Sequence, residues 1–143
     1  MTGYVVRASC HCGRLAMEAT LTRPPHDYAP RACDCDYCSR HGAAWLTDPA
    51  GRLVLRQRGS DAALHYRHGT DQAEFIACAH CAVLVMATYE SEGRLYAALN
   101  VRAIEDDPGF APAQVAQPRL LSAEEKPLRW RQLWFGDVRI ETR

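Results

Sequence analysis

Cys33-Asp34-Cys35-Asp36-Tyr37-Cys38 places three cysteines within six residues of the chain. Cysteines separated by one or two residues can reach a single metal ion when the backbone turns tightly, because each thiolate must lie ~2.3 Å from a zinc ion at one corner of a tetrahedron. The spacing of this stretch therefore favours a metal centre over three unrelated thiols.

Two further cysteine pairs flank this stretch. Cys10-His11-Cys12 precedes it, and Cys78-Ala79-His80-Cys81 follows after a long gap. The chain of 143 residues has seven cysteines, an odd number where disulfides need pairs. In a chain without a secretory signal, this usage indicates metal binding or catalysis rather than an oxidised scaffold.

The segments between the cysteines predict a mainly β, small antiparallel-sheet domain. Leu15–Leu21 alternates between apolar and polar positions, as a half-buried strand does. Asp36–Gly42 is short and polar and is expected to form one helical turn. Further strands are predicted at 43–47, 53–56, 64–68, 73–77, 84–89 and 95–101, with glycines marking turns between them.

The composition changes from Glu105 onward, where prolines recur and nothing is periodic before Trp130. We therefore expect a zinc-binding domain over residues 3–104, followed by an irregular C-terminal arm, residues 105–143, that packs on the same domain. Leu133–Phe135 and Val138–Ile140 flank Gly136-Asp137, which predicts a hairpin at the end of the arm.

Charge and hydropathy exclude several classes of partner. The 17 basic and 17 acidic side chains cancel, so there is no excess positive charge to attract nucleic acid or an anionic membrane. The first residues do not form a basic leader with an apolar run, and no stretch approaches the ~18 to 20 apolar residues that span a bilayer. We expect a soluble cytoplasmic protein; the sequence leaves its oligomeric state open.

The order and spacing of the three cysteine groups resemble the glutathione-dependent formaldehyde-activating enzyme family, which includes centromere protein V. The resemblance also rests on Gly13, on Arg40 and Gly42, and on Tyr66-Arg67 before Gly69. It covers roughly residues 3 to 104. The chain departs from the family in having Ala82, where glycine is usual, and Ser39, where a basic residue is frequent.

The two outer pairs together supply four thiolates, which is enough for a closed structural zinc site that joins distant parts of the chain. The middle group supplies three, which leaves a fourth position for water or substrate, as in catalytic zinc sites. We therefore expect two zinc ions per chain. The metal ligands are Cys10, Cys12, Cys78 and Cys81 in the structural site, and Cys33, Cys35 and Cys38 in the catalytic site.

Other interpretations stay open. His41, Asp34, Asp36 or His11 can close the middle site and make it structural, and thiolates also hold iron-sulfur clusters. His26, His65 and His68 are expected to be solvated surface groups and His80 to point outward, and the three tryptophans are expected to pack. Arg40 and Arg67 are candidates for a substrate carboxylate, although exposure to solvent is the favoured interpretation for both.

The resemblance implies addition of the glutathione thiol to formaldehyde, or the reverse cleavage of a carbon-sulfur bond. The partner is then a small-molecule thiol or aldehyde, and the enzyme is a zinc-dependent carbon-sulfur lyase. The alternative is a non-enzymatic, zinc-stabilised binding module. An open coordination position beside Cys33, Cys35 and Cys38 distinguishes the two.

Overall fold

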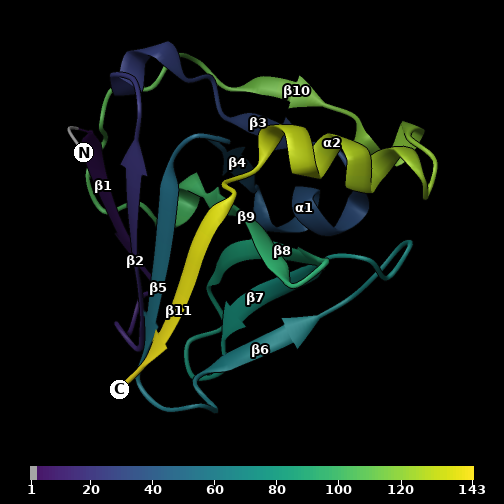
Figure 1. The fold of residues 1–143 in the computed structure, drawn as a ribbon. Coiled ribbons are helices and arrows are strands. Elements are labelled where there is room, and N and C mark those ends of the chain that lie inside the picture. Colours follow the sequence, from purple (N-terminus) through teal and green to yellow (C-terminus); the bar gives the residue numbers. More distant parts are fainter. Residues whose placement is uncertain (1–2) are drawn as a thin grey trace.

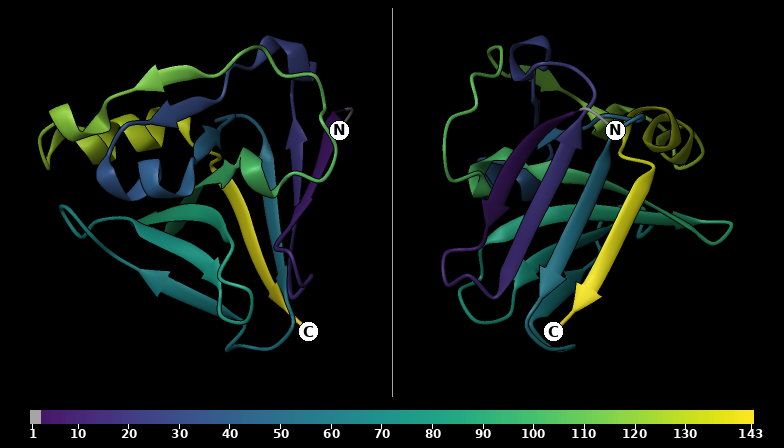
Figure 2. Two further views of the ribbon diagram at one scale, coloured as in Figure 1. Left: turned by 180° about the vertical axis from the view of Figure 1, so that it is seen from behind. Right: turned by 60° about the vertical axis from the view of Figure 1, so that its left-hand side comes forward.

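A computed structural model describes residues 3–143, whose strands form two sheets (Figures 1 and 2). The first sheet has the order β1 (Tyr4–Ser9), β2 (Leu15–Leu21), β5 (Arg52–Gln57), β11 (Asp137–Thr142). The second has the order β10 (Gln114–Ala116), β3 (Arg31–Cys33), β4 (Ala44–Leu46), β9 (Arg94–Asn100), β8 (Leu84–Ser91), β7 (Glu74–Cys78), β6 (Ala63–Tyr66). Most neighbours are antiparallel, which confirms the predicted fold class.

Strand β2 shows why the sequence forms this sheet. Its burial alternates along the whole predicted range Leu15–Leu21, with Leu15, Met17, Ala19 and Leu21 buried. Successive side chains of a strand point to opposite faces, so this pattern turns one face of the first sheet toward the core. The predicted strands corresponding to β4 to β9 are also present, with ends that differ by a residue or two.

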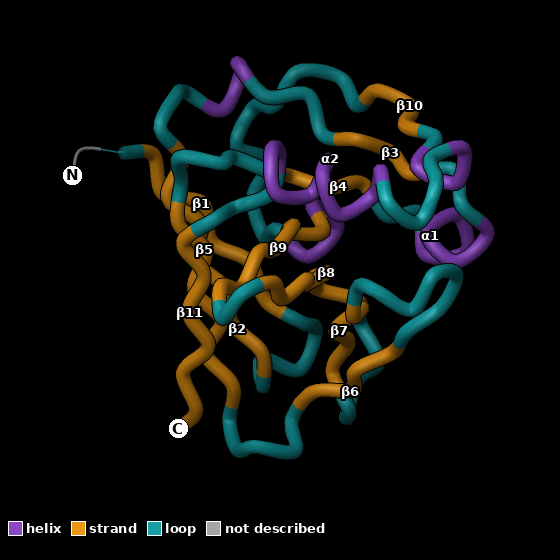
Figure 3. Tube along the Cα trace, turned by 45° about the vertical axis from the view of Figure 1, so that its right-hand side comes forward, coloured by secondary structure: helices purple, strands orange, loops and turns teal. Residues whose placement is uncertain are grey.

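Both faces of the second sheet are buried. Along β9, Ala97 and Leu99 pack in the larger core cluster, which fills the space between the sheets, whereas Ala98 packs in a smaller cluster with Trp45 and Cys38. The second sheet is therefore a middle layer. The first sheet covers one of its faces, and helices α1 (Asp36–His41) and α2 (Glu125–Leu133) lie beyond the other (Figure 3).

The C-terminal segment is more regular than the sequence predicts. It contains α2, and β11 pairs in parallel with β5 along its length, so the predicted terminal hairpin is wrong. A proline in the middle of a helix breaks it, but Pro127 occupies the first turn of α2. The backbone N–H groups of a first turn make no hydrogen bond within the helix, so the absence of this group costs nothing there. The pairing of β11 with a strand some 85 residues earlier has no local signature.

One buried side chain fixes the C-terminal segment to the core. Phe135 has no exposed surface, and its backbone exchanges hydrogen bonds with that of Ala97 on β9, at 2.9 and 3.1 Å. Three short 3₁₀ helices, Pro25–Asp27, Val101–Ala103 and Pro118–Leu120, connect the larger elements. Within residues 3–143, none of the helices has the length and apolar character needed to cross a membrane.

Candidate metal centres and the pocket beside the three-cysteine centre

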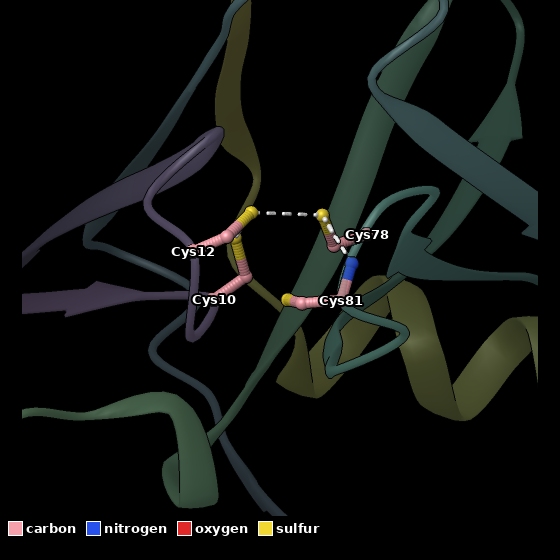
Figure 4. A group of neighbouring side chains, drawn as sticks. All are labelled: Cys10, Cys12, Cys78 and Cys81. Atoms are coloured by element: carbon pink, nitrogen blue, oxygen red, sulfur yellow. Dashed lines mark hydrogen bonds between the residues drawn. The ribbon is translucent and has the colours of Figure 1, made fainter.

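Four cysteines from two distant turns meet at one point. Cys10 and Cys12 lie on the turn between β1 and β2, while Cys78 ends β7 and Cys81 lies in the turn that follows it (Figure 4). The four Sγ atoms lie within 4.8 Å of one another. The Sγ atom of Cys12 is 3.7 Å from that of Cys10 and 3.6 Å from that of Cys78. This group can hold a metal ion between the two sheets.

Backbone amides surround the sulfurs of this four-cysteine centre. Leu15 N donates to the Sγ atom of Cys10 at 3.3 Å, and the amides of His80 and Cys81 donate to that of Cys78 at 3.3 and 3.4 Å. Such donors stabilise thiolates in the form that binds metal. The side chain of His80 is exposed, as predicted.

The second turn of the four-cysteine centre contains Ala82, the position at which the chain departs from the family. Its φ angle is 68°, in the left-handed region, and its amide donates to Cys78 O at 2.9 Å. In the first turn, Gly13 has a φ of 85° and closes a similar bond to Cys10 O at 3.2 Å. The alanine therefore adopts a backbone conformation that favours glycine.

The other three cysteines form a second centre at the start of α1. Cys33 ends β3, Cys35 is the N-cap of the helix, and Cys38 lies in its first turn. The Cys35 Sγ atom accepts a hydrogen bond of 3.3 Å from Cys38 N, and Gly42, with a φ of 61°, ends the helix. The three Sγ atoms lie within 4.8 Å of one another, and this group contains no fourth ligand from residues 3–143.

The side chains that the sequence offered as a fourth ligand have other positions. Asp34 Oδ2 accepts a hydrogen bond of 3.3 Å from Arg119, and Asp36 lies 4.0 Å from Arg40 on the exposed side of α1. His41 packs against Tyr37, with ring centroids 4.9 Å apart. His11 is exposed in the turn of the four-cysteine centre.

Within each centre, the individual thiols differ in their pKa values. Hydrogen bonds from the backbone and side chain of Arg14 lower the pKa of Cys12 to about 6, whereas burial raises that of Cys10 to about 11. In the second centre, a hydrogen bond from the Cys38 thiol lowers the pKa of Cys33 to about 6, and the same bond, with burial, raises the pKa of Cys38. Donor sets made of sulfur alone fit a borderline-soft divalent ion such as zinc.

A cavity of about 380 Å³ adjoins the three-cysteine centre. Cys33, Cys35 and Cys38 line it together with aromatic side chains from two sides. These side chains are Trp45 and Phe75 on the second sheet and Trp130 and Trp134 on and just after α2. The volume is within the range of ~300 to 1,000 Å³ that small-molecule sites occupy.

His68 lines this cavity, contrary to its expected place on the surface. Its Nε2 atom is buried and has no hydrogen-bond partner among residues 3–143. The ring packs against Tyr37 and Phe75, with centroids 4.8 and 4.7 Å away. Burial, together with the charge of Lys126, lowers the pKa of His68 against the opposing charges of Asp36 and Asp71. The imidazole is therefore neutral at pH 7.

The arginines that line the cavity differ from the sequence candidates. Arg40 and Arg67 are exposed and bonded to Asp36 and Glu74. Arg31, Arg119 and Arg129 line the cavity instead, and Arg119 is paired with Asp34. Burial, and after it the charge of Arg129, lowers the pKa of Arg31. Neither His68 nor Arg129 has a local signal in the sequence, because only the packing of α2 and of the loop after β6 brings them to the cavity beside the cysteines.

Comparison with known proteins agrees with the resemblance seen in the sequence. Residues 5–117 match the profile of the family described as glutathione-dependent formaldehyde-activating enzyme, and the chain belongs to this family. A crystal structure of a Rhodobacter sphaeroides protein is similar over 94% of this chain and 98% of its own, with a TM-score of 0.52 and 24% identity. That likeness supports the fold alone. The search of curated proteins gave no match.

Proposed function

We propose that the protein is a zinc-dependent carbon-sulfur lyase that acts on thiol-aldehyde adducts such as S-hydroxymethylglutathione. One observation carries the proposal: three thiols converge at the wall of a cavity, with no fourth ligand from residues 3–143 in their group. A group of this kind leaves a coordination position that a small molecule in the cavity can occupy. The description of the family, which names glutathione and the activation of formaldehyde, supports a thiol and an aldehyde as the reactants.

The two centres take different roles in this proposal. Cys10, Cys12, Cys78 and Cys81 hold a closed zinc ion that connects the sheets, and Cys33, Cys35 and Cys38 hold the zinc ion of the reaction. With three thiolates around it, bound zinc supplies a weakly Lewis-acidic position that suits a sulfur or alkoxide ligand. Cys35 also caps α1, so the helix keeps the three sulfurs in one arrangement.

His68 moves the proton in the proposed reaction. Addition forms one carbon-sulfur bond, and the proton of the thiol must reach the former carbonyl oxygen. The neutral imidazole accepts this proton at a ring nitrogen and returns it to the oxygen. In the reverse direction, the ring takes the hydroxyl proton as the carbon-sulfur bond breaks and gives it to the leaving sulfur. The aromatic walls exclude bulk water from this exchange.

Exchange NMR on glutathione with formaldehyde tests the proposal. The uncatalysed addition is appreciable, so rates are compared with and without protein. The zinc-loaded chain should accelerate exchange, and Cys33→Ser, Cys35→Ser or Cys38→Ser should abolish the acceleration while circular dichroism shows an intact fold. Absence of acceleration by the wild-type chain, across several thiols and aldehydes, would reject the lyase in favour of a binding module.

A further inference from the structure

The cavity beside the three-cysteine centre is completed by a part of the chain outside the family match. The match ends at residue 117, whereas Lys126, Arg129, Trp130 and Trp134 lie beyond it and line the cavity. Helix α2 therefore forms a wall that the family match does not include. Side chains on this wall are in a position to decide which molecules enter the cavity.

Three basic side chains that line this cavity have no carboxylate partner in the described part of the chain, while the lining carboxylate of Asp36 pairs with Arg40 outside it. Within residues 3–143, no carboxylate lies within 4.0 Å of the charged nitrogens of Arg31, Lys126 or Arg129. The half-buried Arg31 donates a hydrogen bond of 2.7 Å to Thr47 Oγ1, which fixes its guanidinium at the cavity wall. Two arginines held near each other repel unless an anion lies between them.

The remainder of the wall is largely apolar and aromatic. Trp130 and Trp134 stack with centroids 5.1 Å apart, and Phe75 and Trp45 face the cavity from the second sheet, 6.1 Å apart. A polar chain against these rings loses hydrogen bonds to water that the wall does not replace. The cavity thus combines sulfur ligands, an apolar body and a cationic pair.

We propose that the cavity takes a thiol, or its aldehyde adduct, with an apolar body that ends in a carboxylate. The sulfur lies at Cys33, Cys35 and Cys38, and Arg31 and Arg129 bind the carboxylate through paired N–H donors. Arg129 on α2 is then a specificity-determining residue. Glutathione meets the requirement for a carboxylate, while the tryptophan wall favours a less polar thiol. This inference rests on the proposed function and names its substrate class.

Matched ligands test the inference by calorimetry on the zinc-loaded chain. 6-Mercaptohexanoate and 6-mercaptohexanol share the thiol and the apolar chain and differ only in the terminal group. The wild-type chain should bind the carboxylate about tenfold more tightly or better, as charge-assisted hydrogen bonds predict. Arg129→Gln should reduce that preference to threefold or less. Arg131→Gln, on the same helix but outside the cavity lining, should retain it.

Hexanoate and hexanol, which have no thiol, provide a readout independent of metal and reaction. The wild-type chain should bind hexanoate more tightly than hexanol, and Arg129→Gln should lose this preference. Equal affinity for acid and alcohol in the wild-type chain, or the same loss in Arg131→Gln, overturns the inference. If that result accompanies catalysed adduct exchange, the inference fails and the lyase stands. A clear carboxylate preference without catalysis supports the inference and rejects the lyase.

Discussion

Ala116 on β10 pairs with Cys33 on β3 in a parallel ladder, and its carbonyl accepts a hydrogen bond of 3.0 Å from Asp34 N. The segment after residue 105 is therefore part of the support of the three-cysteine centre. It fixes the backbone on both sides of Cys33 and then continues into α2 at the cavity.

Metal content should reflect two independent centres. Protein purified without chelator is expected to hold about two zinc ions per chain, because four thiolates and three thiolates each form a zinc-binding set. Cys35→Ser should hold about one. Elemental analysis measures both values. One zinc in the wild-type chain, or iron in place of zinc, would contradict the assignment.

The two centres should differ in their importance for folding. Cys78 is fully buried in the larger core cluster, so Cys78→Ser is expected to yield unfolded or insoluble protein. Cys35→Ser should stay folded, since serine is a good N-cap and can replace the sulfur that accepts from Cys38 N. Thermal melts of both variants check this division, and equal damage from the two would refute it.

Because His68 carries the proton in the proposed reaction, activity should be lost at low pH. The pKa of His68 is lowered from 6.5, so the neutral, proton-accepting form predominates above that value. The value of kcat/KM should fall only as pH drops through this lower pKa. His68→Gln should cut the rate about 10²-fold and abolish this inflection.

Asp71→Asn is a matched control for the profile of His68. Asp71 raises the pKa of His68, so its neutralisation should move the inflection to still lower pH without removing it. Asparagine tolerates the left-handed φ of 58° at this position. An unchanged inflection in His68→Gln would show that another group carries the proton.

The buried Asp48 should make an acid-sensitive contribution to the stability of the fold. Burial alone would raise the pKa of this carboxylate, but hydrogen bonds from Tyr28, Thr22 and Ala50 outweigh burial and lower it below 3.8. Its contribution is therefore complete above 3.8 and is lost as pH falls through the folded-state pKa. Asp48→Asn should cost about 1 to 3 kcal/mol of unfolding free energy at pH 7.

Urea unfolding of the wild-type chain and Asp48→Asn across pH measures this contribution. The difference should be constant from about pH 5 to 8 and shrink below the ordinary carboxyl pKa. Both chains carry the same cysteines, so acid release of metal affects them alike. Tyr28→Phe, which removes one donor at 2.6 Å, should show a smaller cost. A difference that grows in acid would contradict the sign of the pKa shift.

Ala82→Gly should stabilise the chain by up to about 1 kcal/mol. The left-handed backbone conformation strains alanine, and relief of this strain outweighs the larger conformational entropy that glycine loses on folding. Gly13→Ala tests the same conformational effect in reverse. Its φ is 85° and an added Cβ meets nothing within 4 Å, so only backbone strain should lower its stability. Melting temperatures report both changes, and a lower value for Ala82→Gly would argue against strain at this turn.

The sequence predicted the elements whose signals are local. The alternation of Leu15–Leu21 and the polar turn that ends at Gly42 both form as expected. The spacing of the cysteines also predicted which sulfurs lie together. Helix α2 was missed because the residues before Trp130 show no helical periodicity, although Pro127 is compatible with the first turn of a helix.

Residues brought together by tertiary packing could not be predicted in the same way. His68 is the last residue of the strand predicted at 64–68 and was expected to be an ordinary surface group, and Arg129 lies in a segment without periodicity. Only α2, packed over the second sheet, makes them neighbours of the three-cysteine centre. The thiols of the cavity can thus be predicted from the sequence, whereas the residues of its walls cannot.

The burial of Phe135 has a consequence for synthesis of the protein on the ribosome. Until translation has passed Phe135, the core between the sheets lacks this fully buried side chain. Until it has passed Thr142, the first sheet lacks its strand β11. The cysteines at positions 10 to 81 emerge well before that point. A nascent chain can therefore bring its cysteines together and acquire metal while its hydrophobic interior is still open, before β11 joins the first sheet.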